Sequence, residues 1–212
     1  MTNNKALNFT HWIFDLDNTL ADSAIDFNAM RQELGLPLGK GMLEEIDARP
    51  AAEASVLRRR LAALEREYAL RAQPLPGVHE LLTSLVQRGA RLGILTRNNH
   101  ANALQTLAVC DLAEFFDPAH VLGRDEATPK PDPDGIRKLL AAWGAAPATA
   151  VMVGDFRDDL EAGSTTTLQV RTSGRLKPTS ASKATPSCLP CCVGHTTETI
   201  PVQALFATNK DG

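Results

Sequence analysis

Apolar positions along the chain follow two alternating patterns. Short, nearly continuous apolar runs cover residues 11–16, 91–96 and 150–155, and a weaker run covers 120–122. Between these runs, apolar residues recur at helical spacing over 77–88, 99–109 and 132–143. Short buried strands that alternate with helices of this length are typical of βαβ units, in which neighbouring strands are parallel. The pattern therefore predicts an α/β fold built on a parallel sheet.

Residues 21–75 interrupt this alternation. Their apolar positions recur at helical spacing, as in Met30 and Leu34 and again in Leu57 and Leu61, and they show no strand pattern. We therefore expect a small all-helical insertion directly after the first strand. A run of three arginines at 58–60 could bind phosphate or nucleic acid, but glutamates at 53, 65 and 67 favour a solvated helix face.

The character of the chain changes again after residue 164. Ser and Thr become frequent and prolines recur, so only 167–172 has the pattern of a further strand, and 173–212 is expected to be irregular or disordered. Cys188, Cys191, Cys192 and His195 in this tail could bind zinc, although adjacent cysteines close a tetrahedral site poorly. A shift of reading frame would produce an equally abrupt change.

Composition and charge argue against several classes of protein. The chain has 212 residues, of which 43% are hydrophobic, so it can bury a substantial core. A net charge of -3 and an aromatic content of 5% provide neither the basic surface nor the stacking side chains typical of nucleic-acid binding. Residues 1–10 are polar, and no apolar stretch approaches the roughly 20 residues that span a bilayer. We therefore expect a soluble, cytoplasmic protein with no membrane partner; its oligomeric state is left open.

Polar side chains follow the ends of the predicted strands. Because the carboxyl ends of parallel strands meet at one edge of a sheet, where α/β proteins bind ligands, we expect these side chains to lie close together. The candidate site residues are Asp15, Asp17, Thr96, Arg97, Asn98, Lys130, Asp155 and Asp159. Two acids separated by one residue suit phosphoryl transfer with a divalent cation, one acid attacking and the other handling protons.

Each of these groups also has a purely structural interpretation. The Asp15 motif could be an Asx-rich turn that closes a strand. Asp155 and Asp159 could complement a helix dipole, Thr96 could cap a helix, and Lys130 could be an ordinary surface lysine.

In their order along the chain, the candidate residues fall into four segments that resemble the four motifs of the haloacid dehalogenase superfamily of phosphotransferases. The matching residues are Asp15, Asp17 and Thr19 in the first motif, Thr96 in the second, Lys130 in the third, and Gly154, Asp155 and Asp159 in the fourth. The resemblance covers residues 11–163. It implies a three-layer, Rossmann-like core formed by 1–20 and 76–172, and a C1-type helical cap formed by 21–75, as in phosphoglycolate phosphatase-like members.

The resemblance also implies a role for each residue. Asp15 would attack phosphorus to form an aspartyl-phosphate, and Asp17 would protonate the leaving alcohol and then accept a proton from water. Mg²⁺ would be the cofactor. Its ligands would be one oxygen of Asp15, the backbone carbonyl of Asp17 and Asp155, with Asp159 either a further ligand or a support for the other ligands. The phosphate contacts would be Thr96, Arg97, Asn98 and Lys130.

The expected function is a Mg²⁺-dependent phosphatase that acts on a small phosphorylated metabolite, similar to phosphoglycolate or a sugar phosphate. One alternative is a 2-haloacid dehalogenase, although Asp17 argues against it because a halide leaves without a proton. Another is a catalytically impaired relative with a binding role, suggested by the unusual tail. Three positions affect the match. Asn18 replaces the usual Gly, Phe156 stands where Ser is frequent, and Asp158 could substitute for Asp159.

Overall fold

The computed structural model describes residues 9–37, 41–166 and 168–172. A five-stranded parallel sheet forms its centre, in the order β5-β4-β1-β6-β7. Its strands are β1 (His11–Phe14), β4 (Arg91–Leu95), β5 (Val121–Leu122), β6 (Ala150–Gly154) and β7 (Gln169–Thr172). Central strand β1 pairs with β4 on one side and β6 on the other. The prediction of an α/β fold with a parallel sheet is confirmed.

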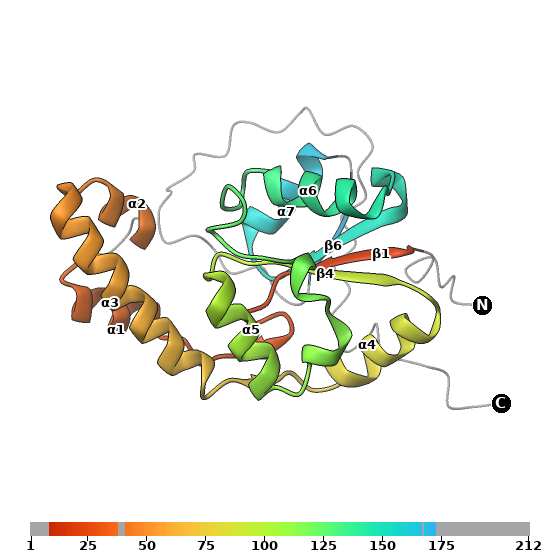
Figure 1. Cartoon of the computed structure of the whole chain (residues 1–212), viewed down its shortest axis with the longest axis horizontal. Coiled ribbons are helices and arrows are strands. Elements are labelled where there is room, and N and C mark those ends of the chain that lie inside the picture. Colours follow the sequence, from red (N-terminus) through yellow and green to blue (C-terminus); the bar gives the residue numbers. More distant parts are fainter. Residues whose placement is uncertain (1–8, 38–40, 167, 173–212) are drawn as a thin grey trace, which may run out of the picture.

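Helices cover both faces of the sheet and make a three-layer core (Figure 1). Helices α4 (Val78–Gln87) and α5 (His100–Val109) lie on one face, and α6 (Asp134–Trp143) and α7 (Arg157–Thr165) lie on the other. Residues of β1 alternate between the two layers. Trp12 and Phe14 pack with α4 and α5, whereas Ile13 packs with α6 and α7, and all three are fully buried. Burial of each such side chain contributes about 1.5–3 kcal/mol.

Helix α6 illustrates how local sequence sets an element. Its buried residues at helical spacing are Ile136, Leu139, Leu140 and Trp143. The helix ends at Gly144, which has a φ of 62°, a left-handed conformation that glycine adopts readily. The Trp143 ring packs closely over β4, because a Cβ added at Gly93 would lie 2.8 Å from it. A glycine in the middle of β4 therefore makes room for the indole.

The insertion between β1 and α4 contains the expected helices and its own apolar cluster. Helices α1 (Phe27–Leu34), α2 (Met42–Asp47) and α3 (Ala51–Ala69) lie beside the core (Figure 1). The buried cluster among them consists of Met30, Leu34, Leu36, Ile46, Ala54, Leu57 and Leu61. We call residues 21–75 the cap, and their status as a separate domain stays a prediction.

The expectation that the cap contains no strand was wrong. Strand β2 (Ala21–Asp22) pairs antiparallel with β3 (Gln73–Pro74), so the two ends of the cap lie side by side. Strands of two residues are too short to show the alternation of apolar and polar positions by which strands are predicted.

Three single 3-10 turns complete the described elements: η2 (Ala113–Phe115), η3 (Pro118–His120) and η4 (Pro147–Thr149). Among the described residues, no helix combines the length and the apolar character needed to cross a bilayer. The predictions of an irregular tail over 173–212 and of a zinc site concern residues outside the described part of the chain. The hypothesis of a shifted reading frame after residue 164 stays a prediction.

Candidate active site

The loop after β1 places the first two candidate acids at the carboxyl edge of the sheet. The backbone N–H of Asp15 donates to the carbonyl of Val153 at 2.8 Å, which ties the end of β1 to β6. The chain then turns back, and the N–H of Asn18 donates to the carbonyl of Ala21 at 2.7 Å. Asn18 has a φ of 56°, a left-handed conformation that asparagine tolerates better than most residues. Asn18 thus fills the position usually held by glycine without disrupting the loop.

Lys130 lies between two buried carboxylates. Its Nζ atom is 2.6 Å from Oδ1 of Asp15 and 2.6 Å from Oδ1 of Asp159. The side chains of Lys130, Asp15 and Asp159 are only 3%, 11% and 1% exposed. The proline-rich loop that carries Lys130 is held to α6, because the N–H of Thr128 donates to Oδ2 of Asp134 at 2.9 Å. The interpretation of Lys130 as a surface lysine is therefore wrong.

Three carboxylates form a cluster that could hold a metal ion. One oxygen from each of Asp15, Asp155 and Asp159 lies within 4.8 Å of the others, and all three residues are buried. Asp159 folds back against the end of β6, where its Oδ2 accepts from the N–H of Phe156 at 3.0 Å. A Cβ added at Gly154 would lie 2.2 Å from this oxygen, so a glycine is needed there. Oδ1 of Asp159 has no hydrogen-bond partner among the described residues, although it contacts the Lys130 ammonium.

This donor set fits a hard divalent cation. Carboxylate oxygens are the ligands that Mg²⁺ and Ca²⁺ prefer. The Lys130 ammonium lies against Asp15 and Asp159, and its single positive charge is smaller than the combined charge of the three carboxylates when all are ionised. A divalent cation bound by these three residues would supply further positive charge.

Burial and neighbouring charges shift the pKa values of Asp15 and Lys130. Burial raises the pKa of Asp15, and the negative charges of Asp159 and Asp17 add to the rise while Lys130 opposes it. Burial by itself would lower the pKa of Lys130, but the neighbouring carboxylates outweigh this effect and raise it. Lys130 is therefore a permanent cation, and additional positive charge nearby would favour the ionised form of Asp15.

Both carboxylate oxygens of Asp17 accept hydrogen bonds. The Ser23 hydroxyl donates to Oδ1 at 2.7 Å, and the Asn98 side-chain amide donates to Oδ2 at 2.7 Å. Burial raises the pKa of Asp17, although the bond from Ser23 opposes this rise. A carboxyl group that is fixed in place and whose pKa is raised suits general acid–base chemistry.

Thr96 and Arg97 follow β4 and have different surroundings. Thr96 is buried, and its Oγ1 accepts from the N–H of Asn98 at 3.1 Å. Arg97 pairs with Oδ2 of Asp158 at 2.8 Å and with Oε1 of Glu44 in the cap at 3.0 Å. In space, Asp159 belongs to the carboxylate cluster, whereas Asp158 pairs with Arg97. The role of Asp159 rather than Asp158 in supporting a metal stays a prediction.

The predicted residues thus fall into three adjoining groups. Lys130 contacts Asp15 and Asp159, with Asp155 beside them; Asn98 contacts Asp17; and Arg97 binds two carboxylates. The roles given to the candidates, including phosphate binding by Thr96, Arg97 and Asn98, stay predictions. The sequence analysis did not identify Ser23, which donates to Asp17, or the ion pair of Glu65 with Arg124, which joins the cap to the core. None of these residues belongs to a recognisable motif.

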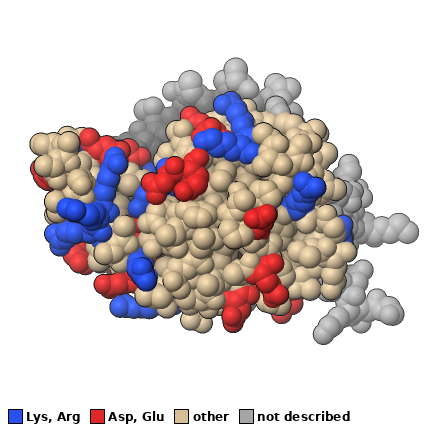
Figure 2. Space-filling view, in the orientation of Figure 1, with Lys and Arg blue, Asp and Glu red and all other residues tan. Residues whose placement is uncertain are grey.

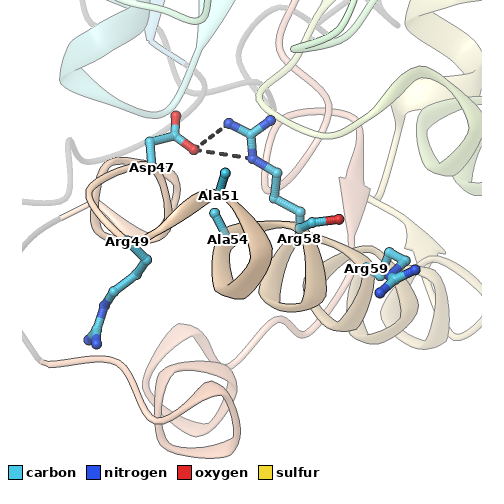
Figure 3. A pocket seen from close by; sticks show the side chains of 7 residues that line it. Asp47, Arg49, Ala51, Ala54, Arg58 and Arg59 are labelled. Carbon is cyan, nitrogen blue, oxygen red and sulfur yellow. Dashed lines mark hydrogen bonds and ion pairs between the residues drawn. The ribbon is translucent and has the colours of Figure 1, made fainter.

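Two of the three consecutive arginines at 58–60 connect helices of the cap. Arg58 on α3 pairs with Asp47 of α2, and Arg60 donates to the carbonyl of Glu33 in α1 at 3.2 Å. Basic side chains gather over the cap in Figure 2. The hollow beside them is lined by Asp47, Arg49, Ala51, Ala54, Ser55, Arg58 and Arg59 (Figure 3). None of the candidate site residues lines this hollow, so it is separate from the carboxylate cluster.

Comparison with known proteins identifies the family. Residues 39–172 match the family model described as haloacid dehalogenase-like hydrolase. The chain belongs to this family. The pyrophosphatase PpaX of Listeria monocytogenes is 30% identical over 176 residues, covering 73% of this chain and 78% of the relative. A protein of Dickeya dadantii named Probable phosphatase IndB is 35% identical over 172 residues, covering 70% and 74%.

Solved structures of the haloacid dehalogenase family share the fold. A predicted phosphoglycolate phosphatase from Haemophilus somnus has a TM-score of 0.63 at 22% identity, covering 78% of this chain and 85% of that one. A CbbY variant from Rhodobacter sphaeroides, bound to xylulose 1,5-bisphosphate, has a TM-score of 0.62 at 22% identity, covering 78% and 86%. Together with the family match and the named phosphatases, these likenesses confirm the expectation of a phosphatase-type hydrolase with a Rossmann-like core.

Proposed function

We propose that the protein is a Mg²⁺-dependent phosphatase that hydrolyses a small phosphate monoester through an aspartyl-phosphate on Asp15. One observation carries this proposal. The Lys130 ammonium contacts Asp15 within a buried cluster of three carboxylates, and Asp17 lies two residues further along the same loop. The cluster combines an attacking oxygen, a fixed cation for the phosphoryl oxygens and oxygen ligands for a metal ion.

In the first step, a carboxylate oxygen of Asp15 attacks phosphorus and the bond from phosphorus to the leaving oxygen breaks. Lys130 contacts Asp15 directly, so its charge would face the phosphoryl oxygens as the attack begins. The Thr96 hydroxyl, whose oxygen accepts from Asn98, keeps its own proton to donate to the phosphoryl group. Asp17 gives its proton to the leaving oxygen, which departs as an alcohol.

In the second step, the Asp17 carboxylate takes a proton from a water molecule that attacks the same phosphorus. The bond between phosphorus and Asp15 breaks, inorganic phosphate leaves, and both acids return to their starting states. Asp15, Asp155 and Asp159 would hold Mg²⁺. When bound, the cation offsets the repulsion between the Asp15 carboxylate and the phosphate dianion.

Small phosphorylated metabolites are the proposed substrates. Support comes from the modest size of the cap and from two structural relatives, a predicted phosphoglycolate phosphatase and a CbbY variant bound to xylulose 1,5-bisphosphate. Because PpaX is named as a pyrophosphatase, inorganic pyrophosphate belongs in the same test. The prediction of a cytoplasmic location rests on the sequence alone.

A panel of phosphate esters assayed with and without Mg²⁺ tests the proposal. We expect phosphate release that requires Mg²⁺, stops on addition of a chelator and is abolished in Asp15→Asn, which keeps the size of the side chain. Glu67→Gln is the matched control, since Glu67 is a largely exposed cap residue paired with Arg71. Chloride release from a 2-haloacid, or no turnover of any ester by the wild type, would refute the proposal.

A further inference from the structure

A part-buried ion pair joins the cap to the core. The Nη1 and Nη2 atoms of Arg124, which follows β5, donate to Oε1 and Oε2 of Glu65 on α3 at 2.7 and 2.8 Å. The two side chains are only 12% and 10% exposed. A guanidinium that binds both oxygens of one carboxylate has a fixed orientation as well as a strong attraction. The pair therefore holds α3 in a defined position against the core.

The same arginine fixes the loop that follows β4. Its backbone N–H donates to the carbonyl of Asn98 at 2.9 Å, and its Nη1 donates to the carbonyl of Arg97 at 3.3 Å. The loop lies directly against the turn before Arg124, because a Cβ added at Gly123 would be 2.6 Å from the Asn98 carbonyl oxygen. Loss of the Glu65 partner would free Arg124 and loosen the backbone of Asn98.

Asn98 transmits this constraint to Asp17. Its amide nitrogen donates to Oδ2 of Asp17 at 2.7 Å. The amide group also carries an acceptor oxygen, so rotation by half a turn would let Asn98 accept from a protonated Asp17. A single side chain can therefore hold Asp17 in both protonation states that acid–base catalysis requires.

We propose that Glu65 and Arg124 are positioning residues that hold Asn98 against Asp17, so that the seating of the cap orients the catalytic acid. This inference rests on the proposed phosphatase function. Glu65 and Arg124 act through Asn98 and take no part in the attack by Asp15. Their loss should therefore slow the steps in which Asp17 moves a proton and leave attack on phosphorus largely intact.

Leaving-group dependence separates these effects. The assay compares kcat/KM for 4-nitrophenyl phosphate, whose leaving phenolate is stable without a proton, with that for phenyl phosphate and glycerol phosphate. The value of kcat/KM depends only on the steps up to departure of the leaving group. The later hydrolysis of the aspartyl-phosphate therefore does not affect it. General acid catalysis contributes about 10²–10⁴-fold. We expect Glu65→Gln to lower kcat/KM for glycerol phosphate about 10-fold or more, and for 4-nitrophenyl phosphate less than about 2-fold.

Four further variants make the test specific. Asn98→Ala should show the same dependence on the leaving group, and the double variant Glu65→Gln/Asn98→Ala should lose little more than either single one. Arg124→Lys keeps the charge but not the paired contact, and should fall between wild type and Glu65→Gln. Glu67→Gln on the same helix should behave as wild type. Thermal melting of each variant shows whether it is folded.

Two outcomes separate this inference from the proposed function. Equal losses of kcat/KM for all three esters in Glu65→Gln would overturn the positioning role, provided that Asp17→Asn shows the leaving-group dependence. A wild type that hydrolyses none of the esters would instead overturn the phosphatase function itself.

Discussion

Replacement of Lys130 by methionine should destabilise the metal-free protein strongly. Methionine has a similar length and no charge, so Asp15 and Asp159 would lose the ammonium that lies 2.6 Å from each. All three side chains are almost inaccessible to water, so solvent cannot replace the lost charge. Removing one partner of a buried ion pair costs about 3–5 kcal/mol, because the remaining charge is left uncompensated.

The size of the effect follows from this value. In a chain of about 200 residues, 1 kcal/mol shifts Tm by about 2–4 °C, so Lys130→Met should melt about 6–20 °C below the wild type in a chelating buffer. Lys138→Met is the control, because Lys138 is half exposed and its pair with Asp134 lies at the surface. Pairs of that kind contribute about 0.2–1 kcal/mol.

Two additions should reverse part of the loss. Asp159→Asn introduced into Lys130→Met removes an unpaired carboxylate charge and should raise Tm. Mg²⁺ should raise Tm more in Lys130→Met than in the wild type, because the cation would neutralise the same carboxylates. The reasoning would be refuted if Lys130→Met in chelator melts within about 2 °C of Lys138→Met, the range of a surface substitution.

Three other predictions concern the same edge of the sheet. Burial raises the pKa of Asp15 to about 8, so the folded metal-free protein keeps a proton that the unfolded chain loses near pH 4. Its unfolding free energy should then fall between about pH 4 and about pH 8, and Asp15→Asn should flatten this trend in denaturant titrations; an unchanged slope would contradict the assignment. Gly154→Ala places a Cβ 2.2 Å from Asp159, and should raise the Mg²⁺ concentration needed for half-maximal activity about 10-fold or more; an unchanged requirement would argue against Asp159 as a ligand. Asn18→Val should cost about 1–2 kcal/mol in unfolding free energy because of the left-handed φ, whereas Asn18→Gly should be nearly neutral; equal melting of both would contradict a strained loop.

The core of the fold could be predicted because its strands are buried on both faces. Trp12, Ile13 and Phe14 pack alternately into the two helical layers, so β1 appears in the sequence as an unbroken apolar run followed by acids. Parallel strands then bring the polar residues that follow them to one edge. The contact of Lys130 with Asp15 follows from that topology, although the two residues are 115 positions apart.

Contacts between the cap and the core could not be predicted in this way. Glu65 belongs to the cap and Arg124 to the core, 59 positions apart, and nothing in their local sequence distinguishes them from solvated charges. The same is true of Ser23, a common residue whose significance lies only in its contact with Asp17. Local patterns report which face of an element is buried, but not which polar side chains meet across an interface.

Strands β2 and β3 form a small two-stranded sheet of their own, and almost the whole cap is the loop of this β-hairpin. Strands β2 and β3 pair at its base, so a two-residue turn between Asp22 and Gln73 could in principle close the same ladder. The entropy of closing a loop grows by only about 0.6 kcal/mol for each doubling of its length, so such a base accommodates insertions of very different sizes. A core shortened in this way would keep the Lys130 cluster but lose Ser23 and Glu65. Exchange of the loop would thus preserve the attacking group while replacing part of the surroundings of the acid.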